Sequence, residues 1–352
     1  MSGAVGRQGF ELLLAGDGKV GWRTSACAAP RGSQVRVKVE VVGICASDVA
    51  LLTGTYAAPH RKPAVVPGHE WAGVVEAIGP DVQRLQIGDR VTGECSLWCG
   101  GCDRCGRNRN LCRKIEKFGI TVDGAAREHL VIEERYLHRA LPGIEADILA
   151  LAEPLAVCHQ GILAGLSAPI SASSRVLVIG AGMIGLGSAF LLRRFFGCRR
   201  IHVHDLEPAR LRRAEAFGVE ALDQLPRGRA STAGYGELYG AEGFDLVIET
   251  TGAPAALERG IEILNPGGSL VLLGFTGSAR LAPRLLVISG TRLVGSIGGS
   301  GSFEAIVPWL GEHAREARKL ISHTLVANEA EDAFAIAQDR NAALKVQMRF
   351  AA

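Results

Sequence analysis

The chain has 352 residues, of which 47% are hydrophobic, and this length and composition predict two domains, each with its own core. Its 39 Lys and Arg residues nearly balance its 36 Asp and Glu residues and form no long block, so a nucleic-acid-binding surface is not expected. Residues 1–8 contain no signal-peptide core, and the longest apolar stretch, 176–192, is too short to span a membrane. We therefore expect a soluble, cytoplasmic protein that binds neither nucleic acid nor membrane.

The first 140 residues are predicted to be rich in β-strands. Apolar and polar residues alternate in segments 10–14 and 34–42, a period of two that is typical of strands with one buried face. Helical character begins near residue 146 and continues to about 166. Further short strands are expected at 66–75, 88–91 and 128–132.

The first group of possible metal ligands lies in this β-rich part. It consists of Cys45, in Gly43-Ile-Cys-Ala-Ser-Asp48, and of His69 and Glu70, in Gly68-His-Glu70. Cysteine, histidine and carboxylate side chains bind zinc tetrahedrally, and a catalytic site leaves one position open. The gap between Cys45 and His69 is long, so a buried cysteine and a core histidine remain the simpler interpretation of the spacing alone.

Cysteines are concentrated in a second group. The chain has nine, an odd number, and five of them fall between Cys95 and Cys112, which favours metal binding in a reducing compartment over a secreted disulfide framework. Four thiolates on a Gly-rich, charged loop predict a closed structural zinc site. Cys95 is left over, as a spare thiol or a substitute ligand. The four predicted ligands are Cys99, Cys102, Cys105 and Cys112.

An iron–sulfur cluster is the alternative for these four cysteines. A ferredoxin-type run would place its fourth cysteine much nearer and follow it with proline, whereas Arg113 follows Cys112 here. Zinc is therefore favoured.

Glu153 lies where helical character begins, in Ala152-Glu-Pro-Leu-Ala-Val157. An acidic residue at a helix N-terminus interacts favourably with the helix dipole, so the position alone does not require a ligand role. Cys158 and His159 follow, and we interpret them as packing residues rather than metal ligands.

A glycine motif lies midway along the chain, directly after the apolar strand predicted at 176–179. Gly180 turns the chain tightly, Gly182 lets a pyrophosphate approach the backbone, and Gly185 lets the strand pack closely on a helix expected at 188–196. The diphosphate of a dinucleotide would lie at the positive end of that helix. Met183 and Ile184, inside the motif, are assigned to the cofactor as well.

Asp205 follows the second strand of this region, 201–204, at the spacing where a carboxylate binds the ribose hydroxyls of NAD. Because a carboxylate repels a 2′-phosphate, NAD is favoured over NADP. A helix N-cap before Glu207-Pro208 is the alternative role of Asp205, and Arg210 close behind could weaken the discrimination.

Strands and helices alternate through this second region, which predicts a doubly wound parallel sheet. The tail returns to mixed structure, with helices expected at 303–312 and 329–338 and a last strand at 345–350. The strands expected in the sheet are 176–179, 201–204, 244–248, 269–273 and 292–294.

Taken in order, these segments resemble the zinc-dependent medium-chain alcohol dehydrogenase family over nearly the whole chain. The segments around Glu153 and Asp205 resemble its sorbitol and threonine dehydrogenase branch. The matching pieces are Gly43-Ile-Cys-Ala-Ser-Asp48, Pro67-Gly-His-Glu70, Ile87-Gly-Asp-Arg-Val91, the four-cysteine lobe, Glu153-Pro-Leu, the glycine motif, Glu249-Thr-Thr-Gly252 and Asn265-Pro-Gly-Gly268.

The resemblance implies an α/β protein of two domains. Residues 1–156 and 300–352 would form a GroES-like, β-rich catalytic domain that carries the structural-zinc lobe at 95–113. Residues 157–299 would form a Rossmann domain that binds NAD, with the active site in the cleft between the domains. Relatives are dimers or tetramers, so a homodimer or homotetramer is expected.

The resemblance also assigns roles to single residues. Cys45, His69 and Glu153 would hold a catalytic zinc, and Glu70 would be an alternate ligand or a partner of the ligands. Ser47 would hydrogen-bond the substrate hydroxyl, and Asp48 would orient His69. Thr251 and Gly274 would join the glycine motif, Asp205 and Arg210 in binding the cofactor.

Three departures from the family pattern qualify these roles. Members often carry a histidine five residues beyond the zinc cysteine to pass the proton to solvent, and here that residue is Ala50. The gap between Cys105 and Cys112 is one residue shorter than expected. Sorbitol-type enzymes place an arginine in the segment that is here the small, glycine-rich 295–301, which favours a roomier pocket.

The function expected from the resemblance is reversible oxidation of a secondary alcohol to its ketone, with zinc binding the oxygen and NAD accepting a hydride. A polyol, a sugar or an aminocyclitol-like alcohol is preferred as substrate. The alternatives are a threonine-type amino-alcohol dehydrogenase, a zinc-free NADPH enone or quinone reductase, and a non-catalytic redox sensor that binds zinc and dinucleotide.

Overall fold

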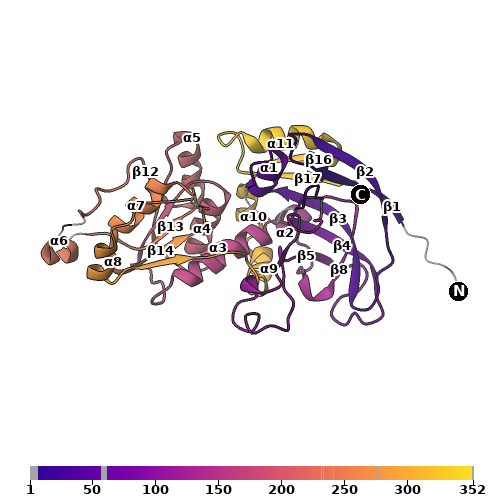
Figure 1. Ribbon diagram of the computed structural model, residues 1–352, viewed down its shortest axis with the longest axis horizontal. Helices are drawn as coiled ribbons and strands as arrows, with labels where there is room; N and C mark the ends of the chain where they lie inside the picture. The colour runs from indigo at the N-terminus through magenta and orange to yellow at the C-terminus, as the bar shows by residue number, and fades with distance from the viewer. Residues whose placement is uncertain are drawn as a thin grey trace. The chain divides into compact units, whose positions relative to one another are not determined.

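The structure is a computed structural model that describes residues 7–56, 62–230, 232, 234–240, 242–275 and 277–350. The chain divides into two compact units, one made of Met1–Ala156 with Gly299–Ala352 and the other of Val157–Gly298 (Figure 1). The division predicted from the sequence placed Gly299 in the second unit instead. The predicted fold class is confirmed, since the first unit is β-rich and the second is built on a doubly wound parallel sheet.

The first unit is organised around one mixed sheet. Its longest strand, β3 (Gln34–Ile44), alternates buried and half-buried residues because one face lies on the core, as the period of two predicted. The strand order is β16-β17-β3-β4-β5-β9, with β8 also paired to β3. The other strands of this sheet are β4 (Glu70–Ile78), β5 (Arg90–Gly93), β8 (His129–Glu133), β9 (Leu137–Arg139), β16 (Ile321–Val326) and β17 (Lys345–Arg349).

Small sheets and further α-helices also belong to the first unit. Its core is aliphatic with a few large aromatic side chains, among them the fully buried Trp71 and Phe334. Burial of these apolar side chains is the main source of the unit's stability. The remaining elements are β1 (Arg7–Leu14), β2 (Val20–Cys27), β6 (Ser96–Leu97), β7 (Glu116–Lys117), α1 (Ala46–Leu52), α2 (Ala146–Leu149), α9 (Phe303–Glu312), α10 (Ala314–Ala317) and α11 (Ala330–Gln338).

The second unit contains a six-stranded parallel sheet of order β12-β11-β10-β13-β14-β15. The order reverses between β10 and β13, so the carboxyl ends of these two neighbouring strands form the switch point where ligands bind in such sheets. The strands are β10 (Arg175–Ile179), β11 (Arg200–His204), β12 (Glu220–Leu222), β13 (Phe244–Glu249), β14 (Leu264–Leu272) and β15 (Arg292–Gly295).

Helices cover both faces of this sheet. Leu270 packs in one cluster with Leu257 of α7, whereas a Cβ on Gly165 of α3 would meet the next residue of the strand, Val271. Neighbouring residues of a strand point to opposite faces, so α3 and α7 lie on opposite sides. The helices of the second unit are α4 (Met183–Arg194), α5 (Pro208–Leu211), α6 (Tyr235–Gly240), α7 (Pro254–Glu262) and α8 (Pro283–Ser289), and α3 (Ala152–Gly165) begins in the first unit.

One predicted helix was placed wrongly. The helix after the glycine motif was expected at 188–196, but α4 begins at Met183, with Gly182 as its N-cap. The glycines of the motif therefore lie partly inside the helix, which propensity alone disfavours. Close packing, described below for Gly185, explains why glycine is used there.

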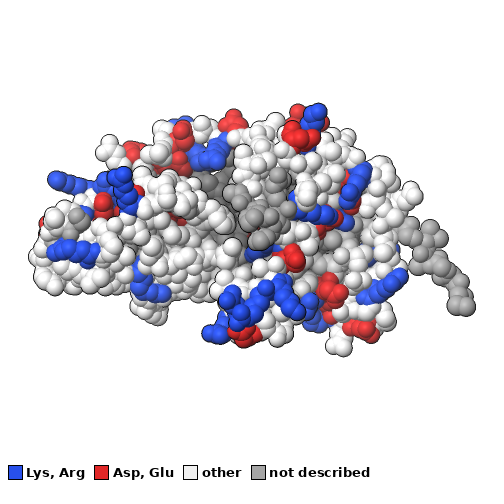
Figure 2. All heavy atoms as spheres, in the orientation of Figure 1, with Lys and Arg blue, Asp and Glu red and all other residues white. Residues whose placement is uncertain are grey.

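The apolar segment that leads into the second unit is mostly buried. Among the described residues, Ala146–Gly165 is long and apolar enough to cross a membrane, but 78% of its most apolar window is buried inside the protein. Such burial is typical of a helix in a protein core. Figure 2 shows basic and acidic side chains interspersed among uncharged ones on the face in view, in agreement with the near balance of charge.

Candidate active site

Cys45, His69 and Glu70 come together in the first unit. Each offers one ligand atom, and these atoms lie within 4.8 Å of one another. Strand pairing explains how residues distant in the sequence meet: Cys45 follows β3 as the N-cap of α1, and Glu70 begins β4, which pairs with β3 in the register Gly43 to Glu70. The group of possible ligands predicted from the sequence is therefore one site.

One ring nitrogen of the buried His69 imidazole has no hydrogen-bond partner. Its Nδ1 is buried and accepts or donates no hydrogen bond, and the nearest carboxylate oxygen, Asp48 Oδ1, is 3.9 Å away. Asp48 instead accepts the backbone N–H groups of Cys45 at 2.9 Å and Gly68 at 3.3 Å. The imidazole also contacts the Cys45 thiol, and because Nδ1 makes no hydrogen bond, this contact belongs to the other ring nitrogen, Nε2, which would bind a cation shared with Cys45.

The electrostatics of this site also favour a cation. Burial alone would lower the pKa of His69, but Cys95, Asp48 and Cys45 together raise it well above its ordinary value. The interactions of the imidazole with these three side chains therefore outweigh the effect of burial. A thiol, an imidazole and carboxylates form a donor set that fits zinc.

Glu153, the predicted third ligand, is not one of the three clustered residues. It lies in the first turn of α3 with a buried side chain. Burial raises the pKa of Glu153 to about 7, with Glu70 raising it further and His69 and Lys345 lowering it. The carboxyl group therefore interacts with the same centre, and its role as a ligand stays a prediction.

Lys345 is a member of this site that the sequence analysis missed. Its Nζ donates to Glu70 Oε1 at 2.8 Å and to the carbonyl oxygen of Ile44 at 3.1 Å, and the side chain is almost fully buried. Burial would lower the pKa of Lys345, but Glu70, Cys45 and Asp48 raise it above its ordinary value. The one signal in the sequence is a lysine at the first position of a strand whose next three residues, 346–348, are uncharged.

Ser47 and Ala50 both lie on α1, directly after Cys45. The Ser47 Oγ is buried and has no hydrogen-bond partner, which leaves it able to serve a bound substrate. Ala50 offers no donor or acceptor of its own. Ser47 thus offers a hydroxyl group near Cys45 in the sequence, whereas the side chain of Ala50 offers no polar group.

The four cysteines of the lobe form a second cluster. Their sulfur atoms lie within 4.8 Å of one another, with pairs at 3.4 Å and 3.9 Å. A tetrahedral zinc with bonds of about 2.3 Å would place its sulfurs about 3.8 Å apart, so the spacing fits a closed site. The clustered residues are Cys99, Cys102, Cys105 and Cys112.

Backbone N–H groups stabilise thiolates in this lobe. Those of Cys99 and Lys114 each donate to Cys112 Sγ at 3.3 Å, and they lower the pKa of Cys112. Backbone donors likewise lower the pKa of Cys102 to about 6. Burial and the contact with Cys102 raise the pKa of Cys105 to about 11, so the backbone donors favour the thiolate, the form that zinc binds, at Cys102 and Cys112.

Cys95, Cys158 and His159 belong to neither cluster. Cys95 is buried and its thiol faces the carbonyl oxygen of Phe118 at 3.9 Å, so the lobe has its four sulfurs without it. Cys158 faces the carbonyl oxygen of Ile184 at 3.3 Å, and His159 packs against the ring of Phe195. These contacts agree with the interpretation of Cys158 and His159 as packing residues.

The glycine motif of the second unit has the geometry that the sequence predicted. Gly180 ends β10 with a φ of 107°, a conformation that favours glycine. Nothing lies within 4 Å of the position a Cβ on Gly182 would take, so a ligand can approach the backbone there. A Cβ on Gly185 would lie 1.7 Å from the carbonyl oxygen of Gly180, so only glycine allows the strand and helix to pack this closely. Met183 and Ile184 form the first turn of α4.

Asp205 lies at the carboxyl end of β11, beside the glycine motif. Its Oδ2 accepts the backbone N–H of Ala181 at 2.7 Å and lies 3.5 Å from the Arg210 guanidinium, and its Oδ1 accepts the N–H of Glu207 at 2.9 Å. The carboxylate is therefore fixed in orientation next to the predicted diphosphate site. The bond to Glu207 lies in a turn, and Asp205 is not the N-cap of α5, which is Glu207.

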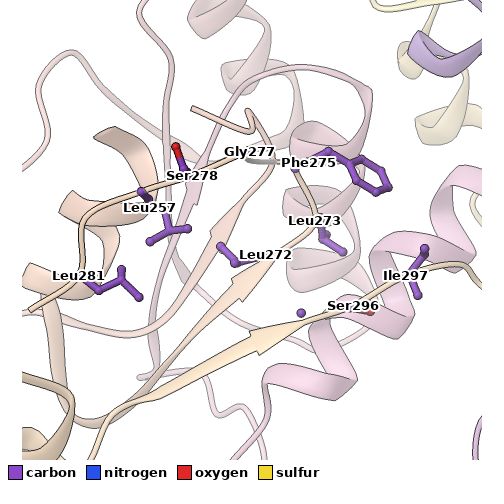
Figure 3. A pocket seen from close by; sticks show the side chains of 12 residues that line it. Leu257, Leu272, Leu273, Phe275, Gly277, Ser278, Leu281, Ser296 and Ile297 are labelled. Atoms are coloured by element: carbon purple, nitrogen blue, oxygen red, sulfur yellow. The ribbon is translucent and has the colours of Figure 1, made fainter. Parts of the chain in front are cut away.

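Thr251 and Gly274 lie just past the carboxyl ends of β13 and β14. The fully buried Glu249 carboxylate accepts the N–H groups of Thr251 at 2.6 Å and Gly252 at 3.0 Å and thereby shapes this turn. Gly274 lines a mainly apolar cavity of about 480 Å³, and Figure 3 shows Leu272, Leu273 and Ile297 on its wall. The carboxyl ends of the parallel strands thus offer space for a ligand.

Comparison with known proteins decides the family. The model of the alcohol dehydrogenase GroES-like domain matches residues 31–142, and that of the zinc-binding dehydrogenase matches residues 184–312. The L-threonine 3-dehydrogenase of Francisella tularensis subsp. novicida (strain U112) is 30% identical over 318 residues, which cover 86% of this chain and 88% of that one. The chain belongs to the zinc-dependent medium-chain alcohol dehydrogenase family.

Other members of this alcohol dehydrogenase family are similarly close. The starvation-sensing protein RspB of Escherichia coli (strain K12) is 27% identical over 91% of this chain and 93% of its own. A putative zinc-binding dehydrogenase from Sinorhizobium meliloti 1021, solved bound to NADP, is 26% identical with a TM-score of 0.84 over 97% of this chain and 99% of its own. The protein is therefore a dehydrogenase of this family, an oxidoreductase that acts on alcohol groups.

Proposed function

We propose that the protein interconverts a secondary alcohol and its ketone in a reaction that requires zinc and NAD. The observation that carries the proposal is the cluster of Cys45, His69 and Glu70, whose ligand atoms lie within 4.8 Å of one another, together with the buried, unpartnered Ser47 hydroxyl two residues after Cys45. A metal ligand set next to a free proton acceptor is what alcohol oxidation needs. Cys45 and His69 would hold the ion, with Glu153 as the third ligand.

The residues of the chain have distinct parts in this reaction. When bound, zinc supplies a Lewis acid that lowers the pKa of the substrate hydroxyl, and nicotinamide supplies the hydride acceptor. Ser47 accepts the hydroxyl proton and passes it on to water, since Ala50 has no group that could relay it. Asp48 is fixed by two backbone N–H groups with its Oδ1 3.9 Å from His69 Nδ1, and it would orient the imidazole by electrostatic attraction. Overall, the carbinol carbon loses a hydride and the oxygen loses a proton.

NAD is the proposed cofactor. The Asp205 carboxylate is fixed at the end of β11 by the N–H of Ala181, beside the site proposed for the diphosphate. A carboxylate there accepts hydrogen bonds from the ribose hydroxyls and repels a 2′-phosphate. Arg210 would favour a phosphate, but its guanidinium lies 3.5 Å from Asp205, and this pairing weakens its attraction for a second anion.

A polyol, a sugar or an aminocyclitol-like alcohol is the proposed substrate. Residues 295–301 supply no large side chain apart from Ile297, which leaves room for a ring. An amino alcohol of the threonine type is the second candidate, because a relative at 30% identity is an L-threonine 3-dehydrogenase.

The test is NAD⁺ reduction by the purified protein with a panel of polyols, sugars, aminocyclitols and L-threonine. We expect turnover with at least one cyclic secondary alcohol, and loss of that turnover after metal removal with retention of NAD binding. Full activity in a sample shown to contain no zinc would contradict the proposal, as would reduction of an enone with NADPH but of no ketone with NADH.

A further inference from the structure

Glu70 and Lys345 form a buried ion pair at the edge of the proposed metal site. Lys345 Nζ donates to Glu70 Oε1 at 2.8 Å and lies 2.5 Å from Oε2, and both side chains are at most 4% exposed. A third contact joins Nζ to the carbonyl oxygen of Ile44 at 3.1 Å. Lys345 therefore contacts a possible ligand and the backbone directly before Cys45.

The strand order in the sheet of the first unit brings Lys345 and Glu70 together. Strand β3 lies between β17 and β4, and its last residues pair with the first residues of both, Ile44 with Val346 and Gly43 with Glu70. Gly43 leaves the space that the carboxylate fills, because a Cβ there would lie 2.6 Å from Glu70 Oε2. The position of the pair is thus fixed by the strand register.

The charges explain what the lysine does for the site. A Glu70 carboxylate without a cation beside it would be strongly attracted to an ion bound by Cys45 and His69. A Glu70 ligand atom already lies within 4.8 Å of Cys45 Sγ and a His69 nitrogen, so it can reach the ion without movement of the backbone. Binding of Glu70 would take the position that a substrate oxygen requires.

We propose that Lys345 is a positioning residue that holds Glu70 away from the metal and so keeps a coordination position open for the substrate. This inference rests on the proposed function, since it assumes a metal at Cys45 and His69. It assigns no bond-making step to Lys345. Its effect is exerted through Glu70 alone.

The experiment measures the open position directly, without turnover. Co²⁺ replaces zinc in the full chain, and imidazole, which binds an open position on Co²⁺, is titrated while the visible absorption of the metal is followed. In Lys345→Met we expect imidazole affinity to fall by about ten-fold or more, the size of effect that groups behind a metal ligand have. Co²⁺ bound at the four-cysteine lobe contributes the same background absorption in every variant.

The matched controls are Glu70→Gln and the double variant Lys345→Met/Glu70→Gln, which leaves no buried charge unpaired. The double variant should bind imidazole as Glu70→Gln does. If the single Lys345→Met variant does not fold, the comparison of the double variant with Glu70→Gln still tests the inference. An imidazole affinity that is ten-fold lower in the double variant than in Glu70→Gln would show that the lysine does not act through Glu70. Unchanged imidazole affinity in folded Lys345→Met would also overturn the inference.

The proposed function fails in a different way. If the unmodified chain binds cobalt only at the four-cysteine lobe, imidazole produces no spectral change in any variant, and the metal count is one per chain. That result contradicts the proposed catalytic metal and with it the premise about Lys345. Two metals per chain with no effect of Lys345→Met contradicts only the inference about Lys345.

Discussion

Glu153 is a buried carboxylic acid whose charge depends on its burial and on the ionisable groups of the proposed metal site. In the absence of metal, burial raises its pKa from the ordinary 4.5 to about 7. The folded chain therefore holds this proton at pH values where the unfolded chain has released it. The stability that this group contributes is fully present below about pH 4.5 and is lost as the pH rises through about 7.

This environment predicts a pH effect on metal-free protein. Between pH 4.5 and pH 7, the free energy of unfolding should fall by at most about 3 kcal/mol because of Glu153. Glu153→Gln, which cannot ionise, should lack this part of the decline. Urea unfolding of both metal-free proteins across this pH range measures the difference, and parallel curves would contradict the assignment of the shifted pKa to Glu153.

Asp205 is the residue on which cofactor choice depends. We expect Asp205→Ser to lower kcat/KM with NAD by roughly 10- to 100-fold, because charged hydrogen bonds to the ribose are lost, and to raise the relative use of NADP. Steady-state kinetics with both cofactors test this. Glu207→Gln removes a neighbouring, exposed negative charge and should leave the ratio of the two cofactors unchanged; an equal effect of both variants would argue against a specific role of Asp205.

Strand β10 and helix α4 show, at the scale of elements, why two glycines of one motif have different tasks. At Gly185 an added Cβ would meet the carbonyl oxygen of Gly180 at 1.7 Å, whereas at Gly182 it would meet nothing within 4 Å. Gly182 has a φ of −84°, which alanine also adopts. Packing of the strand against the helix therefore requires glycine at position 185. At position 182 only the close approach of a ligand would require it.

The two alanine variants should separate stability from binding. Gly185→Ala should destabilise the second unit by about 1–3 kcal/mol or more, as overpacking does. Gly182→Ala should cost less than about 1 kcal/mol in stability, yet weaken NAD binding by at least about ten-fold, or about 1.4 kcal/mol. Thermal unfolding and NADH fluorescence titration measure the two effects. Wild-type NAD affinity in Gly182→Ala would show that no diphosphate lies there.

The sequence predicts elements best where a local period exists. The alternation in 34–42 and the apolar run at 176–179 correspond to β3 and β10, and the helix expected at 303–312 matches α9. Strands β12 and β16 were not predicted, because β12 has three residues and the residues of β16 are at most half-buried. Their strand conformation comes from pairing with neighbours, which no local pattern encodes.

In the candidate site, too, the residues that could be predicted are those with a local sequence motif, and the one that could not depends on the three-dimensional fold. Cys45, His69, the four-cysteine lobe and Asp205 could be identified because residue type, motif and order along the chain point to their chemistry. Lys345 could not, because its partner Glu70 lies 275 residues away and only the order of β17, β3 and β4 brings them together. A single lysine in a strand carries no sign of the charge it will meet.

The central claim, that the metal at Cys45 and His69 performs the chemistry, is tested most directly by counting metal in two cysteine variants. Elemental analysis should find two zinc ions per unmodified chain. Cys102→Ser should retain one zinc and still reduce NAD⁺ with an alcohol substrate at temperatures below its lowered unfolding transition. Cys45→Ser should also retain one zinc but lose turnover. Two zinc ions or undiminished NAD⁺ reduction in Cys45→Ser would contradict the account.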